Sequence, residues 1–443
     1  MHIKKIIFNN NILINFLISF LPLSLMLGNL IINTNIILIC LLGLKIYKFE
    51  IFKVDQKIFQ YLFYSFFLYL ILITLLRNIH NLDDNVLYKE HIFKSFFYLR
   101  FLIFFLVINK VVEKQEFNLQ LFFLSASFFS LILAIDILVQ FYFGSDIFGN
   151  KIIINRPSGF FGDENIAGGY LQKLSLFLIL FAHCYFTFIK KNKINIYLIF
   201  FSSFSLISIL ITSNRMSFLI FLFSITFIFF SLIKNKKKFL LLMSIFLISV
   251  ITLIKYNPYL DRSFGLFSHE VKIIIVNASK LFYTKQTKKI TTFADEDLEK
   301  ITKQGVGYLV IFNSGIQQWK EKKILGRGLK SFRINCQYIR GQTCSTHPHN
   351  YFIEILLDTG VLGLIILYLI FILSTINYLK FYKKNLNASS IVKSTPFFLI
   401  IFFEFFPLRS TGSFFTTNNS VIIFFFLAIF INISRINFFD KKL

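Results

Sequence analysis

Two histidines stand directly before a long apolar run in the segment CSTHPHNYFIEILLDTG, residues 344–360. His347 and His349 flank a proline, and Asn350 follows them. Imidazole titrates near neutral pH, so it can take a proton from a hydroxyl group and pass it on. The pair therefore predicts acid–base chemistry at a membrane boundary, with histidines that only form hydrogen bonds as the alternative.

Two acidic residues continue this motif into the apolar run. Asn350, Glu354 and Asp358 are four residues apart, which places their side chains on one face of a helix. A carboxylate on that face could orient an imidazole or receive its proton. We therefore expect Asn350 and Glu354 to support the histidines.

Arginine is used differently from lysine along the chain. A guanidinium holds a phosphate by two bonds at once, which an ammonium does not. The candidates for phosphate contacts are Arg156, Arg215, Arg327, Arg333 and Arg409, and Arg100 lies near the outer end of a predicted span. In the alternative interpretation each arginine pairs with a nearby acid. Such pairs would join Arg409 to Glu404, and Arg156 to Asp163 or Glu164.

Long apolar runs must position these residues. Of the 443 residues, 56% are hydrophobic, and the mean hydropathy is +0.68. Each run is about long enough to cross a hydrocarbon core of roughly 30 Å as a helix. We predict an all-α polytopic membrane protein with about twelve transmembrane helices. The expected spans are 11–27, 29–45, 58–76, 95–109, 118–142, 169–189, 195–212, 216–233, 239–255, 351–379, 394–408 and 418–434.

The formal net charge is +25, and the positive residues are distributed in step with the predicted spans. Lysines cluster in the loops that come after every second predicted span. The positive-inside rule places these loops and both chain termini in the cytoplasm. The membrane accounts for the excess charge, so we expect no nucleic-acid partner, and the histidine- and arginine-bearing segments share the outer side.

We expect the chain to divide into three parts. They are residues 1–255 with helices 1–9, residues 256–350 as a large external loop, and residues 351–443 with helices 10–12. Residues 143–168 are polar or glycine-rich at membrane depth, where irregular backbone is tolerated only when it is buried in protein or lines a cavity. We therefore predict a re-entrant segment there. Within the large loop, helices are expected at 291–304 and 308–323, and GRGLKSF at 326–332 predicts a tight glycine turn.

The cysteines of the large loop favour a disulfide. Cys336 and Cys344 lie on the side where oxidation is permitted. The alternative, a metal site shared with the two histidines, needs thiolates that an oxidising compartment disfavours. Neither a Walker A motif nor HExxH occurs, and we expect no metal and no cofactor.

Together these segments resemble the O-antigen ligase and O-antigen polymerase family. The resemblance covers most of residues 150–420, and the HPHN-to-TG stretch is its most specific part. It is carried by RPSGFFGDENIAGGYL (156–171), TSNR (212–215), GRGLKSF (326–332), CSTHPHNYFIEILLDTGVLGL (344–364) and FPLRSTGSFF (406–415).

The resemblance implies a glycosyltransferase of the bacterial inner membrane that acts on the periplasmic side. Such an enzyme moves a glycan from undecaprenyl diphosphate to an acceptor hydroxyl without a metal. The implied roles are His349 as the leading base and His347 as the second, Arg156 and Arg215 as the leading diphosphate contacts, Arg409 as the third, and Arg327 and Arg333 after them.

The acceptor stays open at this point. A ligase would use lipid A–core, and a polymerase would use a second lipid-linked glycan. A protein O-oligosaccharyltransferase and a transporter or flippase of lipid-linked glycans are the alternatives. Either way the partners are lipid-linked glycans and membrane lipids.

Overall fold

The computed structural model describes most of the chain as helix. The described residues are 2–53, 55–78, 86–153, 156–189, 196–233, 235–268, 272, 307–335, 345–384 and 388–433. Within these ranges the only β-type pairing is two isolated bridges, Ser145 with Lys151 and Ile153 with Arg156. The prediction of an all-α fold is therefore confirmed for the described part of the chain.

The described residues form the following helices. In chain order they are α1 (His2–Ser19), α2 (Leu21–Met26), α3 (Asn29–Tyr47), η1 (Lys48–Phe52), α4 (Lys57–Asn78), α5 (Val86–Phe97), α6 (Leu99–Glu113), α7 (Leu119–Phe143), η3 (Gly159–Phe161), α8 (Ala167–Ile189), α9 (Ile196–Ile211), α10 (Arg215–Leu232), α11 (Lys236–Tyr256), α14 (Gly307–Glu321), α15 (Phe332–Asn335), α16 (Tyr351–Lys384), α17 (Ala388–Glu404) and α18 (Thr417–Asn432). Residues 258–268 are also helical.

Several helices are suited to a membrane. Among the described residues, seven are long and apolar enough to span one, and four shorter apolar helices accompany them. The seven are Asn29–Phe52, Lys57–Asn78, Lys89–Glu113, Leu119–Phe143, Arg215–Leu232, Phe239–Tyr256 and Tyr351–Lys384. A helix also lies at each stretch predicted as a span, but the count of twelve stays a prediction.

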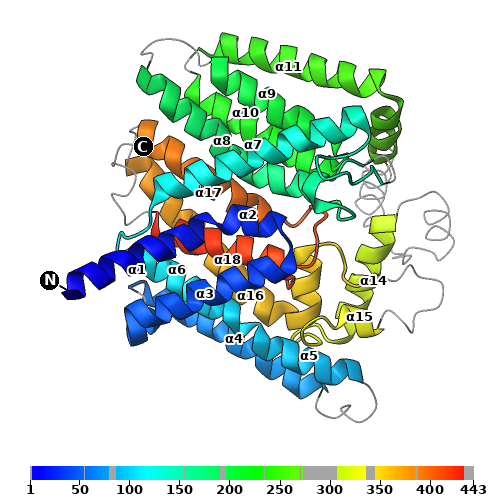
Figure 1. The fold of residues 1–443 in the computed structure, drawn as a ribbon. Coiled ribbons are helices and arrows are strands. Elements are labelled where there is room, and N and C mark those ends of the chain that lie inside the picture. The colour runs from blue at the N-terminus through cyan, green and yellow to red at the C-terminus, as the bar shows by residue number, and fades with distance from the viewer. Residues whose placement is uncertain are drawn as a thin grey trace.

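Helix α18 lies at the centre of the bundle (Figure 1). Every residue from Ser420 to Asn432 is buried, so this helix is apolar on all sides. Its Phe424 ring lies 5.4 Å from Phe67 of α4, and its Phe426 ring lies 5.8 Å from Phe177 of α8. Because lipid gives no hydrophobic drive between helices, close packing of this kind holds a membrane bundle together.

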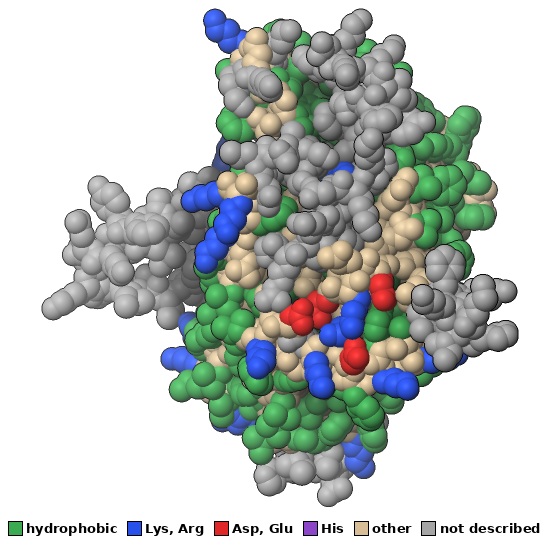
Figure 2. All heavy atoms as spheres, turned by 90° about the vertical axis from the view of Figure 1, so that its left-hand side faces the viewer, with side chains coloured by type: hydrophobic (Ala, Val, Ile, Leu, Met, Phe, Trp, Pro, Cys, Tyr) green, Lys and Arg blue, Asp and Glu red, His purple; other side chains and the backbone are tan. Residues whose placement is uncertain are grey.

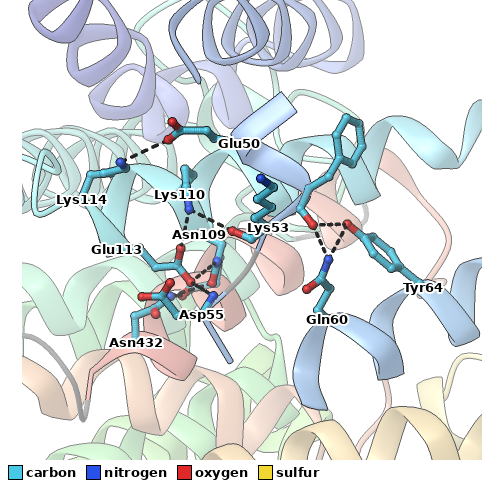
Figure 3. Close-up of polar contacts among 12 residues, drawn as sticks. Glu50, Lys53, Asp55, Gln60, Tyr64, Asn109, Lys110, Glu113, Lys114 and Asn432 are labelled. Carbon is cyan, nitrogen blue, oxygen red and sulfur yellow. Dashed lines mark hydrogen bonds and ion pairs between the residues drawn. The ribbon is translucent and has the colours of Figure 1, made fainter. Parts of the chain in front are cut away.

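One end of the bundle carries lysine-rich helix ends, and we call it the lysine-rich end. It lies on the left in Figure 1 and faces the viewer in Figure 2, which shows Lys and Arg side chains around a small acidic group. Figure 3 shows its polar network: Lys110 Nζ donates to the Lys53 carbonyl at 2.9 Å and to Glu113 at 3.2 Å, and Asn432 Nδ2 donates to Asn109 at 2.7 Å. The Asn432 bond ties the end of α18 to α6, and the Lys110 bond to Lys53 ties α6 to the segment after η1.

The opposite end, which we call the site end, gathers the predicted functional segments. Since consecutive helices alternate in direction, α4, α7, α9 and α17 end there, while α8, α10, α16 and α18 begin there. Helices α14 and α15 lie at this end, on the right in Figure 1. The prediction that the site end faces outward is not tested by this arrangement.

A break in α16 gives the site end its irregular shape. Gly360 has a φ of 64°, which interrupts the helix that was predicted as one continuous span. The glycine turn docks at this break: the backbone N–H groups of Arg327 and Gly328 donate to the carbonyls of Leu357 and Asp358 at 3.0 and 2.8 Å. The predicted turn is confirmed, because Gly326 and Gly328 have φ values of 78° and 90°.

Candidate functional site

The histidine pair lies at the start of α16. The ring centroids of His347 and His349 are 4.1 Å apart, with a 50° angle between the ring planes. Nε2 of His349 lies 3.1 Å from the Ser345 hydroxyl, and Nδ1 of His347 lies 3.0 Å from the Thr346 hydroxyl. Nε2 of His347 is buried and has no hydrogen-bond partner among the described residues.

Burial favours the neutral form of both imidazoles. Burial lowers the pKa of His347 to about 4, and the neighbouring His349 and Lys330 add to the effect. Burial also lowers the pKa of His349, and a hydrogen bond between its imidazole and the backbone of Thr411 acts in the opposite direction. A neutral imidazole can accept a proton, which is what a general base requires.

The backbone at His349 is held in an uncommon conformation. Its φ is 51°, in the left-handed region that non-glycine residues seldom adopt. The N–H of Thr411 donates to the His349 carbonyl at 2.8 Å and stabilises this conformation. Such local strain persists where surrounding contacts determine it.

Asn350 caps α16 and fastens the next loop to it. Its Oδ1 accepts the Ile353 N–H at 3.0 Å, and its Nδ2 donates to the carbonyls of Pro407 and Arg409 at 2.7 and 3.0 Å. Side-chain acceptors at this position satisfy backbone donors that a helix start leaves open. Asn350 therefore positions residues 407–411 beside the histidines.

The two acids of α16 hold loops rather than imidazoles. Glu354 accepts the Ser413 hydroxyl at 2.5 Å and the Phe414 N–H at 2.6 Å. Asp358 accepts the N–H groups of Lys330 and Ser331 at 2.7 and 3.1 Å and the Ser331 hydroxyl at 2.8 Å. The spacing of four correctly predicted a shared polar face, and the structure shows that this face anchors the 413–414 and 330–331 segments.

A buried ion cluster connects α8 to the loop after α17. Glu404 Oε1 lies 3.1 Å from Nη1 of Arg409 and 3.3 Å from Nζ of Lys173. Arg409 Nη1 also donates to the Phe403 carbonyl at 2.9 Å, while its Nε has no hydrogen-bond partner among the described residues. The predicted Arg409–Glu404 pair is confirmed. Lys173 was missed, because a lysine within an apolar run carries no motif of its own.

Gly168, in the first turn of α8, lets the segment that carries Arg156 approach the segment that carries Arg215. A Cβ on Gly168 would lie 2.5 Å from Thr212 Oγ1 and 2.7 Å from Asn214 Cβ, so only glycine fits there. The segments 156–171 and 212–215 therefore pack together. Asn214 caps α10 by accepting the Ser217 N–H at 3.3 Å.

Arg156 and Arg215 lie at the site end in different surroundings. Arg156 is half-buried, and its Nε has no hydrogen-bond partner among the described residues. Arg215 lies over the Phe267 ring at 5.5 Å and donates to the Ser263 carbonyl at 3.3 Å. Glu164 is exposed, and no ion pair to Arg156 occurs in the described part of the chain.

The segment before α8 folds onto the end of α7. Gln140 Oε1 accepts the N–H groups of Ser158 and Gly159, both at 2.8 Å, and Asp136 Oδ1 accepts the Ile147 N–H at 2.9 Å. Both Asp136 and Gln140 are fully buried. These bonds satisfy irregular backbone, as the prediction for residues 143–168 requires, although its re-entrant path stays a prediction.

The remaining candidates are more peripheral. Arg327 forms an ion pair of 2.9 Å with Glu321, an exposed acid, and Arg333 is exposed on α15. Cys336 and Cys344 lie outside the described residues, as does the helix expected at 291–304. Among the residues that are described, no group of three or more His, Cys, Asp or Glu could hold a metal ion.

The apolar helices define a multi-pass membrane protein, and its ionisable site lies at one end of the bundle. Residues 198–368 match the family model described as O-antigen ligase, which confirms the resemblance predicted from the motifs. The matched range contains the histidine pair, Arg215 and the glycine turn, whereas Arg156 and Arg409 lie outside it. No curated protein matches the chain. The family match supports membrane glycosyltransferase activity of the O-antigen ligase type on lipid-linked glycans.

Proposed function

We propose that this protein transfers a glycan from undecaprenyl diphosphate to an acceptor hydroxyl at the periplasmic face of the inner membrane, with both termini in the cytoplasm. The observation that carries the proposal is the closely spaced histidine pair at the head of α16, within the matched family range. A non-enzymatic membrane scaffold does not require a histidine pair. A transporter does not require one that is confined to one side of the membrane.

The proposed reaction is one displacement at the anomeric carbon. The acceptor oxygen forms a bond to that carbon while the bond to the diphosphate oxygen breaks, so the configuration inverts. The acceptor proton passes to an imidazole, His349 first and His347 second. The diphosphate leaves as an anion, and arginine side chains balance its charge in place of a metal.

Under this proposal the arginines differ in how directly they contact the diphosphate. Arg156 and Arg215 are the leading diphosphate contacts, since their segments pack together through Gly168. Arg409 shares Glu404 with Lys173, which leaves the cluster with one net positive charge for a ligand. Arg327 and Arg333 are lesser contacts, because Arg327 is already paired and Arg333 is exposed.

The test uses purified protein, a synthetic undecaprenyl-diphosphate glycan, and lipid A–core or a second lipid-linked glycan as acceptor, with a chelator present. We expect transfer by the wild type, and a loss of about 10²–10⁴-fold in His349→Ala, as for removal of a general base. Arg215→Ala should also lose transfer, and Arg215→Lys should recover part of it because charge remains without the planar fork.

Lys114→Gln is the matched control, because Lys114 is exposed at the lysine-rich end and its ion pair is with Glu50, which is exposed too. The acceptor that is used decides between ligase and polymerase. Tight binding of the donor without transfer to either lipid acceptor or to a Ser- or Thr-containing protein would refute the enzyme and leave a transporter or flippase.

A further inference from the structure

A cationic cleft opens at the site end, apart from the Lys173–Glu404–Arg409 cluster. It lies between the helix pair α5–α6, the glycine turn and the start of α18, and its volume is about 380 Å³. Ligand pockets are typically of roughly 300–1,000 Å³, so the cleft is large enough for a small anionic group. Its polar lining comes from Lys94, Arg100, Lys330, Asn29, Thr416 and Thr417.

The lining contains three cations and no carboxylate. Lys94 pairs with Glu90 at 2.5 Å, but Glu90 lies outside the lining and its side chain is 45% exposed. Arg100 donates from Nη2 to Thr417 Oγ1 at 3.3 Å, while its buried Nε has no hydrogen-bond partner in the described part of the chain. Lys330 forms no ion pair with any described residue. Arg100 and Lys330 therefore bring basic groups to the lining that no carboxylate within the lining pairs with.

The acids near this cleft are occupied elsewhere. Glu354 accepts bonds from Ser413 and Phe414, and Asp358 accepts them from the backbone of Lys330 and from Ser331. These carboxylates hold the walls of the cleft in place. Their attraction for the Lys330 ammonium is outweighed, since burial and the charge of Lys94 lower the pKa of Lys330.

The position of Lys330 is built into the fold. Its φ is 58°, and its N–H is fixed by Asp358 at 2.7 Å. The adjacent Leu329 N–H donates to Thr74 Oγ1 of α4 at 2.9 Å. These contacts fix the backbone from which the Lys330 side chain extends, so less of the chain has to be ordered when a ligand binds. The bond from the Lys330 N–H to Asp358 also ties this wall of the cleft to α16, the helix whose start carries the histidine pair.

We propose that the cleft of Lys94, Arg100 and Lys330 binds a phosphate group of a lipid-linked ligand and forms a second anion site beside the histidines. The inference deepens the proposed function and rests on it for the choice of ligand. When both the donor and the acceptor carry phosphates, a transferase needs one anion site for each. Hydroxyl groups of Thr416 and Thr417 and the planar fork of Arg100 suit phosphate oxygens.

Binding measured without transfer tests this inference separately from the enzyme activity. Purified full-length protein in nanodiscs is titrated with undecaprenyl diphosphate and, in a second arm, with inorganic pyrophosphate. The variants are Arg100→Gln, Lys330→Gln and Lys94→Gln, with Lys114→Gln as the matched exposed control. We expect each cleft variant to weaken binding about tenfold, as for loss of one charged hydrogen bond, and the control to bind as the wild type does.

Charge-retaining variants guard against a mere loss of folding. Lys330→Arg and Lys94→Arg should keep most of the affinity, and thermal midpoints confirm that each variant is folded. If the neutral variants bind both undecaprenyl diphosphate and pyrophosphate more weakly, the cleft is a site for any diphosphate. If they bind only undecaprenyl diphosphate more weakly, the cleft is a site for a lipid headgroup. Wild-type affinity in all three neutral variants overturns the inference, even if glycan transfer is demonstrated. Weakened binding without any transfer keeps the cleft and overturns the enzyme.

Discussion

Replacement of Glu404 by glutamine tests the buried ion cluster most directly. Glu404 is the acid between two cations, and the exposed fractions of the Glu404, Lys173 and Arg409 side chains are 1%, 7% and 8%. Glu404→Gln keeps the shape of the side chain but removes its charge. Lys173 and Arg409 are then left as buried cations without an anion.

The expected cost follows from this geometry. Removal of one partner from a buried ion pair destabilises a protein by about 3–5 kcal/mol, because an uncompensated charge remains. Lys173→Met should cost less, since the Glu404–Arg409 pair at 3.1 Å survives. The order of stability should therefore be wild type, then Lys173→Met, then Glu404→Gln.

An exposed pair provides the matched control. Glu50 lies 3.2 Å from Lys114, but the two side chains are 60% and 47% exposed. Exposed ion pairs contribute about 0–1 kcal/mol, so Glu50→Gln should leave the thermal midpoint nearly unchanged. Thermal unfolding of the four purified proteins is the assay. Equal midpoints for Glu404→Gln and Glu50→Gln would refute the view that burial makes this cluster structurally essential.

Three further outcomes are expected. Asn350→Ala should destabilise the protein by about 3 kcal/mol and reduce transfer, because a helix cap and two bonds to buried loop carbonyls are lost; unchanged stability and transfer would contradict this role. The acid limb of kcat/KM should lie below pH 6.5, since the lowered pKa of His349 keeps the imidazole neutral until the pH falls beneath it; a limb above 6.5 would argue against this base. Gly360→Ala should prevent docking of the glycine turn, because its Cβ would lie 2.1 Å from the Ile324 carbonyl oxygen. The control Gly265→Ala should fold normally, since a Cβ there meets no atom within 4 Å. Similar expression and thermal midpoints for the two variants would refute the argument.

Local patterns in the sequence were sufficient for some of these features. The apolar runs predicted where helices lie, because run length and hydropathy are properties of neighbouring residues. The spacing of four correctly placed Asn350, Glu354 and Asp358 on one face, since helical geometry is local. The Arg409–Glu404 pair was also predictable, as its members are only five residues apart.

The partners of these residues could not be predicted in the same way. Glu354 binds a loop 59 residues later, and Lys173 meets Glu404 across more than half of the chain. Such contacts depend on which helices pack together, and many packings satisfy the same hydropathy pattern. The cleft of Lys94, Arg100 and Lys330 is hidden for the same reason, since lysine is abundant and its three cations come from two distant segments.

The sequence by itself thus determined the helical membrane architecture, the family resemblance and the histidine motif, because each depends on residues close together in the chain. Only the tertiary structure decided that α18 is buried at the centre, that α16 breaks at Gly360, and which cations remain without an acid. Those outcomes follow from long-range packing, in which every buried charge and backbone group must find its partner among helices far away in sequence.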